Sequence, residues 1–290
     1  MAKTTSPKIV LITGCSSGFG LLTAAHLAER GHQVIATMRN LDRSSGLVNE
    51  VNKRGALIDL LPLDVTKKET IKETMALIAA DYGYLDCLVN NAGYGIGGAF
   101  EDLTEEEIRE QMETNFFGVQ NVTREAIHLM RQRGNARIIN ISSVAGFSAS
   151  PCFSAYNASK WALEGFSESL HYELKPFGIK VLLIEPGVYK TKIFFENRRY
   201  ATHFHDPDSP YYDVSQHLKK RTLDYVEDCH KDPEDVARLV EKLMLAKNPA
   251  FRNHPDWEAR IQYLCRKYLP FWFYSRAVES FYLSGFSAKK

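Results

Sequence analysis

The sequence has no long apolar run, no excess of one charge and no paired cysteines. Its 36 Lys and Arg residues nearly balance 35 Asp and Glu residues, so no global field draws the chain to nucleic acid. The five cysteines lie far apart without a C-x-x-C pair, which favours a reducing compartment. Residues 1–8 lack the apolar stretch of a signal peptide, and we expect a short disordered leader there. These absences predict a cytoplasmic protein with no nucleic-acid partner, no transmembrane span and no metal site.

Short apolar runs alternate with segments of helical period along most of the chain. Strands are expected at residues 8–14, 32–38, 56–65, 85–93, 136–143 and 179–187, and helices at 21–30, 70–82, 105–133 and 155–177. Strands that are apolar on both faces and separated by helices imply a parallel sheet covered on both sides. The sequence therefore predicts an α/β fold: a Rossmann-type doubly wound parallel sheet of about seven strands, with helices on both faces, in one domain over residues 1–290.

The alternation stops after Gly187. Residues 188–230 combine charges, aromatics and proline without a clear strand, and we expect a substrate-binding insertion over the carboxyl edge of the sheet. Pro233 opens a predicted amphipathic helix that ends at Leu245. Residues 255–290 are expected to form a helical extension rich in aromatic residues, which Pro270 and several charges keep from being a continuous apolar span.

A glycine-rich turn, TGCSSGFG at residues 13–20, lies between the first predicted strand and the first predicted helix. In a doubly wound fold this is where a dinucleotide binds, because glycine lets the backbone approach the pyrophosphate and the helix start stabilises its charge. No Lys-Ser or Lys-Thr pair follows, so the turn is not a P-loop. The alternative is a purely structural turn. The predicted contacts are Gly14, Ser16, Ser17, Gly18, Phe19 and Gly20.

The end of the second predicted strand bears on the choice of cofactor. It carries Arg39 and Asn40 where an acidic residue would otherwise hydrogen-bond the ribose 2′-hydroxyl. A guanidinium suits a 2′-phosphate, so NADP(H) is favoured over NAD(H), unless Arg39 is only a solvated surface charge. Asp64, with Val65 beside it, is the candidate for the adenine side of the site. The alternative for Asp64 is an N-cap of the next helix.

Tyr156 and Lys160 stand four residues apart, on one face of a predicted helix. A phenol with a pKa near 10 is a poor base at neutral pH, and we expect the Lys160 cation to lower the pKa of Tyr156 into the working range. Ser143, at the carboxyl end of a predicted strand, would be a second hydrogen-bond donor for a substrate oxygen. Such a tyrosine and lysine can also be mere exposed neighbours on a helix.

Together these motifs resemble the short-chain dehydrogenase/reductase family over residues 9–191. The similarity covers the turn at 13–20, NNAG at 90–93, Asn115, Ser143, the Tyr156 and Lys160 pair, and PGVYKT at 186–191, all in the order of the family. Taken singly, Asn115 could merely kink or cap a helix and Pro186-Gly187 could merely end a strand.

The resemblance implies a role for each matched residue. Tyr156 would be the general acid/base, Ser143 would polarise the substrate oxygen, and Lys160 would also hold the nicotinamide ribose, with Asn115 behind it in a proton relay. The remaining cofactor contacts would be Asn91, Ala92 and Gly93 on the adenosine side, and Pro186, Gly187, Val188 and Thr191, of which Val188 and Thr191 would hold the carboxamide.

Within the family, the turn and the end of the second strand resemble the hydroxysteroid and retinol dehydrogenase branch, which implies a hydrophobic alcohol or carbonyl substrate. The aromatics of residues 189–212 and 268–286 could then line an apolar pocket, touch lipid at a membrane surface, or only pack against the domain. Family members often form homodimers or homotetramers through two long helices, here 105–133 and 155–177. A non-catalytic NADPH sensor, or an epimerase or dehydratase, are the alternative functions.

Overall fold

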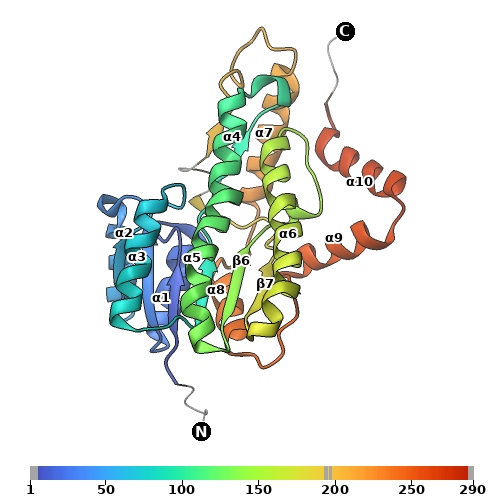
Figure 1. The fold of residues 1–290 in the computed structure, drawn as a ribbon. Coiled ribbons are helices and arrows are strands. Elements are labelled where there is room, and N and C mark those ends of the chain that lie inside the picture. Colours follow the sequence, from blue (N-terminus) through green and yellow to red (C-terminus); the bar gives the residue numbers. More distant parts are fainter. Residues whose placement is uncertain (1–5, 193–194, 196–197, 287–290) are drawn as a thin grey trace.

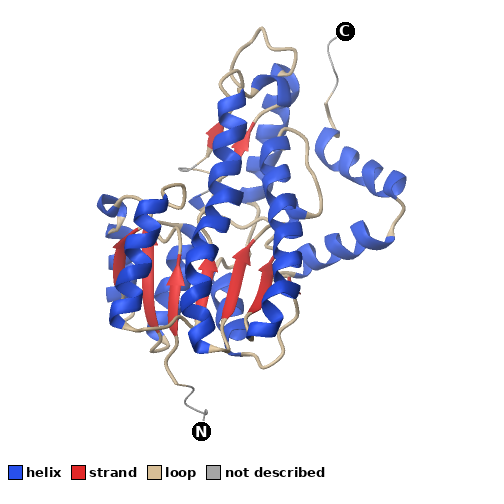
Figure 2. Ribbon diagram, in the orientation of Figure 1, coloured by secondary structure: helices blue, strands red, loops and turns tan. Residues whose placement is uncertain are grey.

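A seven-stranded parallel sheet forms the centre of the computed structural model, which describes residues 6–192, 195 and 198–286 (Figures 1 and 2). The strand order is β3-β2-β1-β4-β6-β7-β9. The strands are β1 (Ile9–Ile12), β2 (Gln33–Met38), β3 (Asp59–Pro62), β4 (Cys87–Asn90), β6 (Arg137–Ile141), β7 (Lys180–Ile184) and β9 (Arg252–Asn253). The predicted fold, a Rossmann-type doubly wound sheet, is confirmed.

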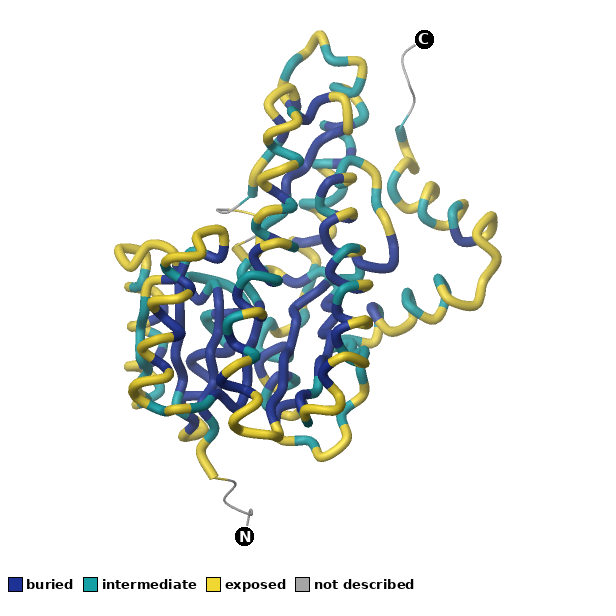
Figure 3. Tube along the Cα trace, in the orientation of Figure 1, coloured by how far each residue is buried: buried dark blue, intermediate teal, exposed yellow. Residues whose placement is uncertain are grey.

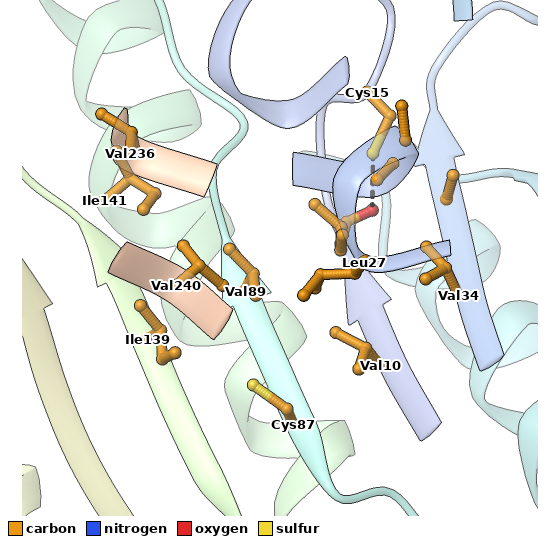
Figure 4. Close-up of a cluster of buried hydrophobic side chains, with 14 of the residues drawn as sticks. Val10, Cys15, Leu27, Val34, Cys87, Val89, Ile139, Ile141, Val236 and Val240 are labelled. Carbon is orange, nitrogen blue, oxygen red and sulfur yellow. Dashed lines mark hydrogen bonds between the residues drawn. The ribbon is translucent and has the colours of Figure 1, made fainter. Parts of the chain in front are cut away.

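Both faces of the sheet are covered by helices, and successive strand residues point to opposite faces. Val10 and Ile12 join the cluster under α1 (Gly18–Glu29), α2 (Ser45–Lys53) and α8 (Glu234–Leu245), part of which Figure 4 shows. Ile9 and Leu11 join the cluster under α3 (Lys68–Asp81), α5 (Gly118–Arg133) and α6 (Ser154–Leu174). All residues of β1, β4 and β6 are buried, so the carboxyl ends of these strands are held in fixed positions.

The predicted helix at 105–133 is divided into three parts. α4 (Glu105–Met112) begins with a capping box in which Thr104 and Glu107 exchange hydrogen bonds. A π-helical turn, Glu113–Phe117, then leads into α5. One extra residue per turn is a local feature that a hydrophobic period does not reveal, and such turns are common at functional sites.

Three short strands and one helix were not predicted. β5 (Ile96–Gly97) pairs with β8 (Arg199–Tyr200), so the predicted insertion at 188–230 does contain a strand. β9 adds the seventh strand beside β7. Strands of two residues are too short to show a period, and their pairing partners lie far away in sequence. α2 was also missed, because its nine residues carry few apolar positions.

The insertion and the C-terminal extension also contain helices. α7 (Tyr212–Glu227) lies beyond the carboxyl ends of the strands, while α9 (Trp257–Tyr268) and α10 (Phe271–Leu283) project from the side of the molecule (Figures 1 and 3). No helix in the described part of the chain is long and apolar enough to cross a membrane. Residues 1–5 of the predicted leader, 193–194 and 196–197 of the insertion, and 287–290 of the extension lie outside the described residues.

Candidate active site

The predicted catalytic side chains meet at the carboxyl end of β6. Ser143 follows this strand by two residues, and its side chain interacts with the hydroxyl of Tyr156 on α6. Lys160, one helical turn later, donates from Nζ to the Ile141 carbonyl at 2.9 Å, and Nζ lies 5.9 Å from the centre of the Tyr156 ring. The structure therefore brings together three side chains that the sequence places up to 17 residues apart.

Asn115 lies in the π-helical turn and is almost fully buried. Its Oδ1 accepts a hydrogen bond from the Tyr94 backbone N–H at 3.1 Å, and its Nδ2 donates to the Tyr94 carbonyl at 2.9 Å. The same Nδ2 donates to Ser159 Oγ at 3.1 Å. Asn115 thus links the loop after β4 to α6 beside Lys160. Its role in the fold is therefore more than that of a helix kink or cap.

The titration of Tyr156 differs from the expectation. Burial raises the pKa of Tyr156 because it disfavours the phenolate, and the hydrogen bond from Ser143 only partly offsets this. Burial also lowers the pKa of Lys160 to about 8, with the nearby Glu164 carboxylate acting in the opposite direction. The expected lowering of the Tyr156 pKa by Lys160 is not found, because the lysine is itself desolvated and its ammonium is directed to a backbone carbonyl.

The glycine turn is packed against the loop after β4 so closely that side chains cannot fit. Gly14 has a φ of +74°, and a Cβ there would lie 2.7 Å from Ala92 Cα. A Cβ on Gly20 would lie 2.3 Å from Asn91 Nδ2, which donates to the Thr13 and Gly14 carbonyls at 2.9 and 3.1 Å. Asn91 therefore holds the turn in place, while Gly93 stays exposed beside it.

The start of α1 offers an anion site. The helix begins at Gly18, its N-cap Ser17 makes no side-chain capping hydrogen bond, and its first turn contains no acidic residue. Backbone N–H groups and the helix dipole at such an end favour phosphate. Gly18 also faces Thr191, whose Cβ would lie 4.0 Å from an added Cβ, so the predicted carboxamide residue borders the same turn. The residues present fit the pyrophosphate of a dinucleotide.

The remaining turn residues line or support this site to different degrees. Ser16 and Phe19 are partly exposed, and the Phe19 ring stands edge-on to the ring of Tyr189 at 5.4 Å between centroids. Pro186 is buried, and its carbonyl accepts a hydrogen bond from the Val144 N–H at 3.0 Å. Gly187 N–H donates to Asp256 Oδ2 at 3.1 Å. The segment after β7 is thereby fixed between the turn and the end of β6, with Val188 partly exposed.

The predicted adenosine residues separate into exposed and buried ones. Arg39 and Asn40 are exposed, and Asn40 Oδ1 accepts from the Asp42 N–H at 2.9 Å. Asp64 Oδ1 accepts from the N–H and the hydroxyl of Thr66 at 3.0 and 2.8 Å. The N-cap of α3 is Lys67, so Asp64 forms a local turn and does not cap that helix. Val65 is buried, with its side chain in the core near the start of α5, so only its backbone is near the edge of the sheet.

A buried charged network behind Lys160 was not predicted from the sequence. The Ser142 hydroxyl donates to Glu164, and Arg252 bridges Glu164 and Glu185. Burial, together with the neighbouring Glu185, raises the pKa of Glu164 to about 8. The only sequence signal was that Glu164 follows Lys160 by four residues on the same helix face. Ser142 follows β6, Glu185 follows β7 and Arg252 belongs to β9, and only the folded chain brings these segments together.

The fold, the glycine turn and the three converging side chains define a dinucleotide-dependent oxidoreductase. A family model for short chain dehydrogenases matches residues 8–201. The chain belongs to this family, whose members use a nicotinamide cofactor and act on CH–OH groups or the corresponding carbonyls.

Similar proteins and solved structures support the same family. A 3-ketodihydrosphingosine reductase of Bacteroides thetaiotaomicron is 40% identical over 248 residues, which are 85% of this chain and 87% of the relative. Retinol dehydrogenase 8 of Bos taurus is 34% identical over 261 residues, covering 87% and 82%. The crystal structure of a short-chain dehydrogenase from Streptomyces avermitilis superposes with a TM-score of 0.78 at 34% identity, covering 95% and 96%.

Proposed function

We propose that the protein transfers a hydride between NADP(H) and a hydrophobic alcohol or ketone, with Tyr156 as the general acid/base. The observation that carries the proposal is the convergence of Ser143, Tyr156 and Lys160 at the sheet edge that also holds the glycine turn. The nicotinamide, when bound, supplies or accepts the hydride. The side chains of this chain supply the proton and the donors that hold the substrate oxygen.

The hydroxyl groups of Tyr156 and Ser143 are suited to donate to a substrate oxygen. Because burial raises the pKa of Tyr156, its phenol is neutral at neutral pH and can donate a proton to the oxygen of a ketone. Ser143 Oγ accepts a hydrogen bond from the Ala145 N–H at 3.1 Å, which leaves its own proton available to donate. The two hydroxyls together stabilise negative charge that develops on the substrate oxygen.

Lys160 and Asn115 stand behind Tyr156 and complete the site. The Lys160 ammonium has further donors besides the one bonded to Ile141, and these would hold the nicotinamide ribose. Asn115 connects the Tyr94 backbone to Ser159 on the Lys160 helix, which fixes the distance between the two catalytic segments. A non-catalytic sensor would need the glycine turn but none of these four side chains.

The preference for NADP(H) rests on Arg39. Its side chain is exposed at the carboxyl end of β2, next to the glycine turn, and no acidic residue occupies the strand end. A guanidinium in this place can form a charge-assisted hydrogen bond to a 2′-phosphate.

The hydrophobic substrate is supported by the relatives and by the aromatic composition above the site. One relative is named for a sphingoid ketone and another for retinol, both long apolar molecules. In this chain the ring of Phe153 lies 6.4 Å from the ring of Tyr156, measured between centroids. The neighbouring rings of Tyr200 and Phe204 pack in the cluster around β5. Such rings provide apolar walls for a long substrate.

The test is an assay of NADPH absorbance with long-chain ketones, steroids, retinoids and small ketones. We expect wild-type turnover with at least one apolar carbonyl, and loss of about 100-fold or more in Tyr156→Phe with cofactor binding retained. Tyr172→Phe, an exposed tyrosine on the same helix, is the matched control. No turnover across the whole panel would favour the sensor, whereas product formation without net NADPH consumption would favour an epimerase or dehydratase.

We also propose that copies of the chain associate through α4, the π-helical turn and α6. An apolar groove of about 640 Å³ on α4 and the turn includes Phe100, Ile108 and Phe117 in its lining. Trp161 on the neighbouring α6 is 44% exposed. Light scattering of wild type and of Phe117→Ser with Trp161→Ser tests this, and a wild-type monomer would contradict it.

The compartment is also a proposal. None of the five cysteines forms a disulfide in the described part of the chain, and Cys15 and Cys87 are buried thiols with pKa values raised to about 12. We infer a cytoplasmic protein, which localisation of a tagged full-length chain would test.

A further inference from the structure

The outer face of α9 carries an apolar stripe that no part of the described chain covers. Trp257, Ile261, Leu264 and Tyr268 follow one another at spacings of four, three and four residues, which places them on one helix face. Their side chains are 69%, 50%, 41% and 70% exposed. A stripe of this period normally packs against a core, so α9 is turned with its apolar face outward.

The stripe continues into the corner between α9 and α10. All residues from 268 to 273 are exposed, and among them are Leu269 at 38%, Phe271 at 67%, Trp272 at 62% and Phe273 at 51%. The corner stands at the far edge of the molecule, away from the sheet (Figures 1 and 3). An exposed apolar patch of this kind marks an interaction site with a protein or a membrane.

The charges beside this surface are mostly positive. Residues 259–278 contain Arg260, Arg266, Lys267 and Arg276 and no Asp or Glu, although the whole chain has a net charge of only +1. The acid at the start of the stripe, Glu258, forms an ion pair with Lys231 at 2.8 Å. Arg260 and Lys267, seven residues apart, flank the α9 stripe on one side. Arg276 lies over the Trp272 ring at 5.9 Å. Aromatic rings with cations around them match the boundary between lipid chains and anionic headgroups.

The surface is preformed and fixed to the catalytic segment. The Tyr274 hydroxyl of α10 and Ser148 Oγ are 2.5 Å apart, and Gln262 of α9 donates to the same Ser148 oxygen at 3.0 Å. Ser148 lies five residues after Ser143. The two helices therefore keep their orientation relative to the body, and the stripe and the corner face outward together.

We propose that the α9 stripe and the α9–α10 corner, residues 257–273, dock on the surface of an anionic lipid membrane. With 12 and 13 residues the two helices are too short to span a bilayer, so they lie on it. A second copy of the chain is the less favourable occupant, because an antiparallel two-fold contact would bring Arg260 and Lys267 close to the same cations of the partner. The docking does not depend on the proposed reaction, although it would place the site beside lipid-dissolved substrates.

The experiment is co-sedimentation of the full-length protein with vesicles of phosphatidylcholine, with and without phosphatidylserine, in the absence of substrate. We expect binding to the vesicles with phosphatidylserine, weakened by salt. Phe271→Ser with Trp272→Ser and Phe273→Ser should lower the partition coefficient at least about tenfold. Tyr172→Ser with Phe177→Ser, two exposed aromatics elsewhere, is the matched control and should bind as wild type does.

A second variant separates the charge from the apolar surface. Arg260→Gln with Lys267→Gln should weaken binding only to the vesicles that contain phosphatidylserine and reduce its salt dependence. Wild type that binds neither vesicle, or a triple serine variant that binds like wild type, would overturn the proposal. A triple variant that changes only the oligomeric state, by light scattering, would assign the surface to a second copy instead. NADPH turnover of a small ketone by the triple variant reports separately on the reaction and on folding.

Discussion

The carboxyl edge of the sheet and the C-terminal helices differ in how far their residues are buried. At the sheet edge, Ser143 follows a strand whose residues are all buried, and Tyr156 and Lys160 come from a helix with nine buried residues. In contrast, α9 and α10 have one buried residue each, Ala259 and Tyr274. The proposed chemistry needs fixed distances and lies where side chains are closely packed, whereas the proposed docking surface lies on helices that are mostly exposed.

The largest effect of a substitution at the sheet edge is expected at Lys160. Below pH about 8 its ammonium predominates, and above that pH it is lost, because burial lowers its pKa to about 8. We expect wild-type kcat to fall as the pH rises through about 8, and Lys160→Met to lower kcat about 100-fold or more and to remove this limb. Rate profiles from pH 6 to 10 measure both, with the exposed Lys72→Met as control. A flat wild-type profile would contradict the assignment.

The packing of the glycine turn gives the next effect. Gly14→Ala adds strain at a φ of +74° and a Cβ 2.7 Å from Ala92 Cα, so we expect a loss of about 2 to 4 kcal/mol in the free energy of unfolding. Gly31→Ala is the control, because it has a φ of +81° with nothing within 4 Å, and should cost about 1 kcal/mol. Urea unfolding without cofactor measures the two. Equal losses would mean that the close approach contributes nothing.

Arg39 tests the cofactor side of the same edge. In Arg39→Ala the ratio of kcat/KM for NADPH to that for NADH should fall by about 1.5 to 3 kcal/mol, since a charge-assisted phosphate contact is lost. Arg43→Ala, an exposed arginine close by in sequence, should keep the wild-type ratio. A wild-type enzyme that prefers NADH would refute the prediction.

The smallest effect is expected in the C-terminal helices. Leu264 on α9 is 41% exposed, and Leu243 on α8 is 4% exposed. Leu264→Ala should change the free energy of unfolding by less than about 0.5 kcal/mol, whereas the same substitution at Leu243 should cost about 2 to 5 kcal/mol. Thermal unfolding at one protein concentration compares them. A large loss at Leu264 would show that the stripe packs against something in the isolated protein.

Much of the fold could be predicted because strands and helices of this sheet carry their own periodicity. The runs at 85–93 and 136–143 are apolar on both faces, which a doubly covered parallel sheet requires. β9 could not be predicted, since its two residues gain strand geometry only by pairing with Leu183 and Ile184. The π-helical turn at Asn115 was missed for a similar reason: its stability comes from hydrogen bonds to Tyr94 and Ser159 across the fold.

By itself, the sequence determined the elements of the site: a glycine turn between a strand and a helix, and a tyrosine and a lysine four residues apart on one helix face. These are local patterns, set by steric limits on the backbone and by helical period. Only the tertiary structure decided the electrostatics. Burial raises the pKa of Tyr156 and lowers that of Lys160, and folding places Glu164 beside Glu185 and Arg252. These effects depend on neighbours that are distant along the chain, because such neighbours cause the desolvation. The tertiary structure also decided the exposure of the α9 stripe, because no other described element packs against it.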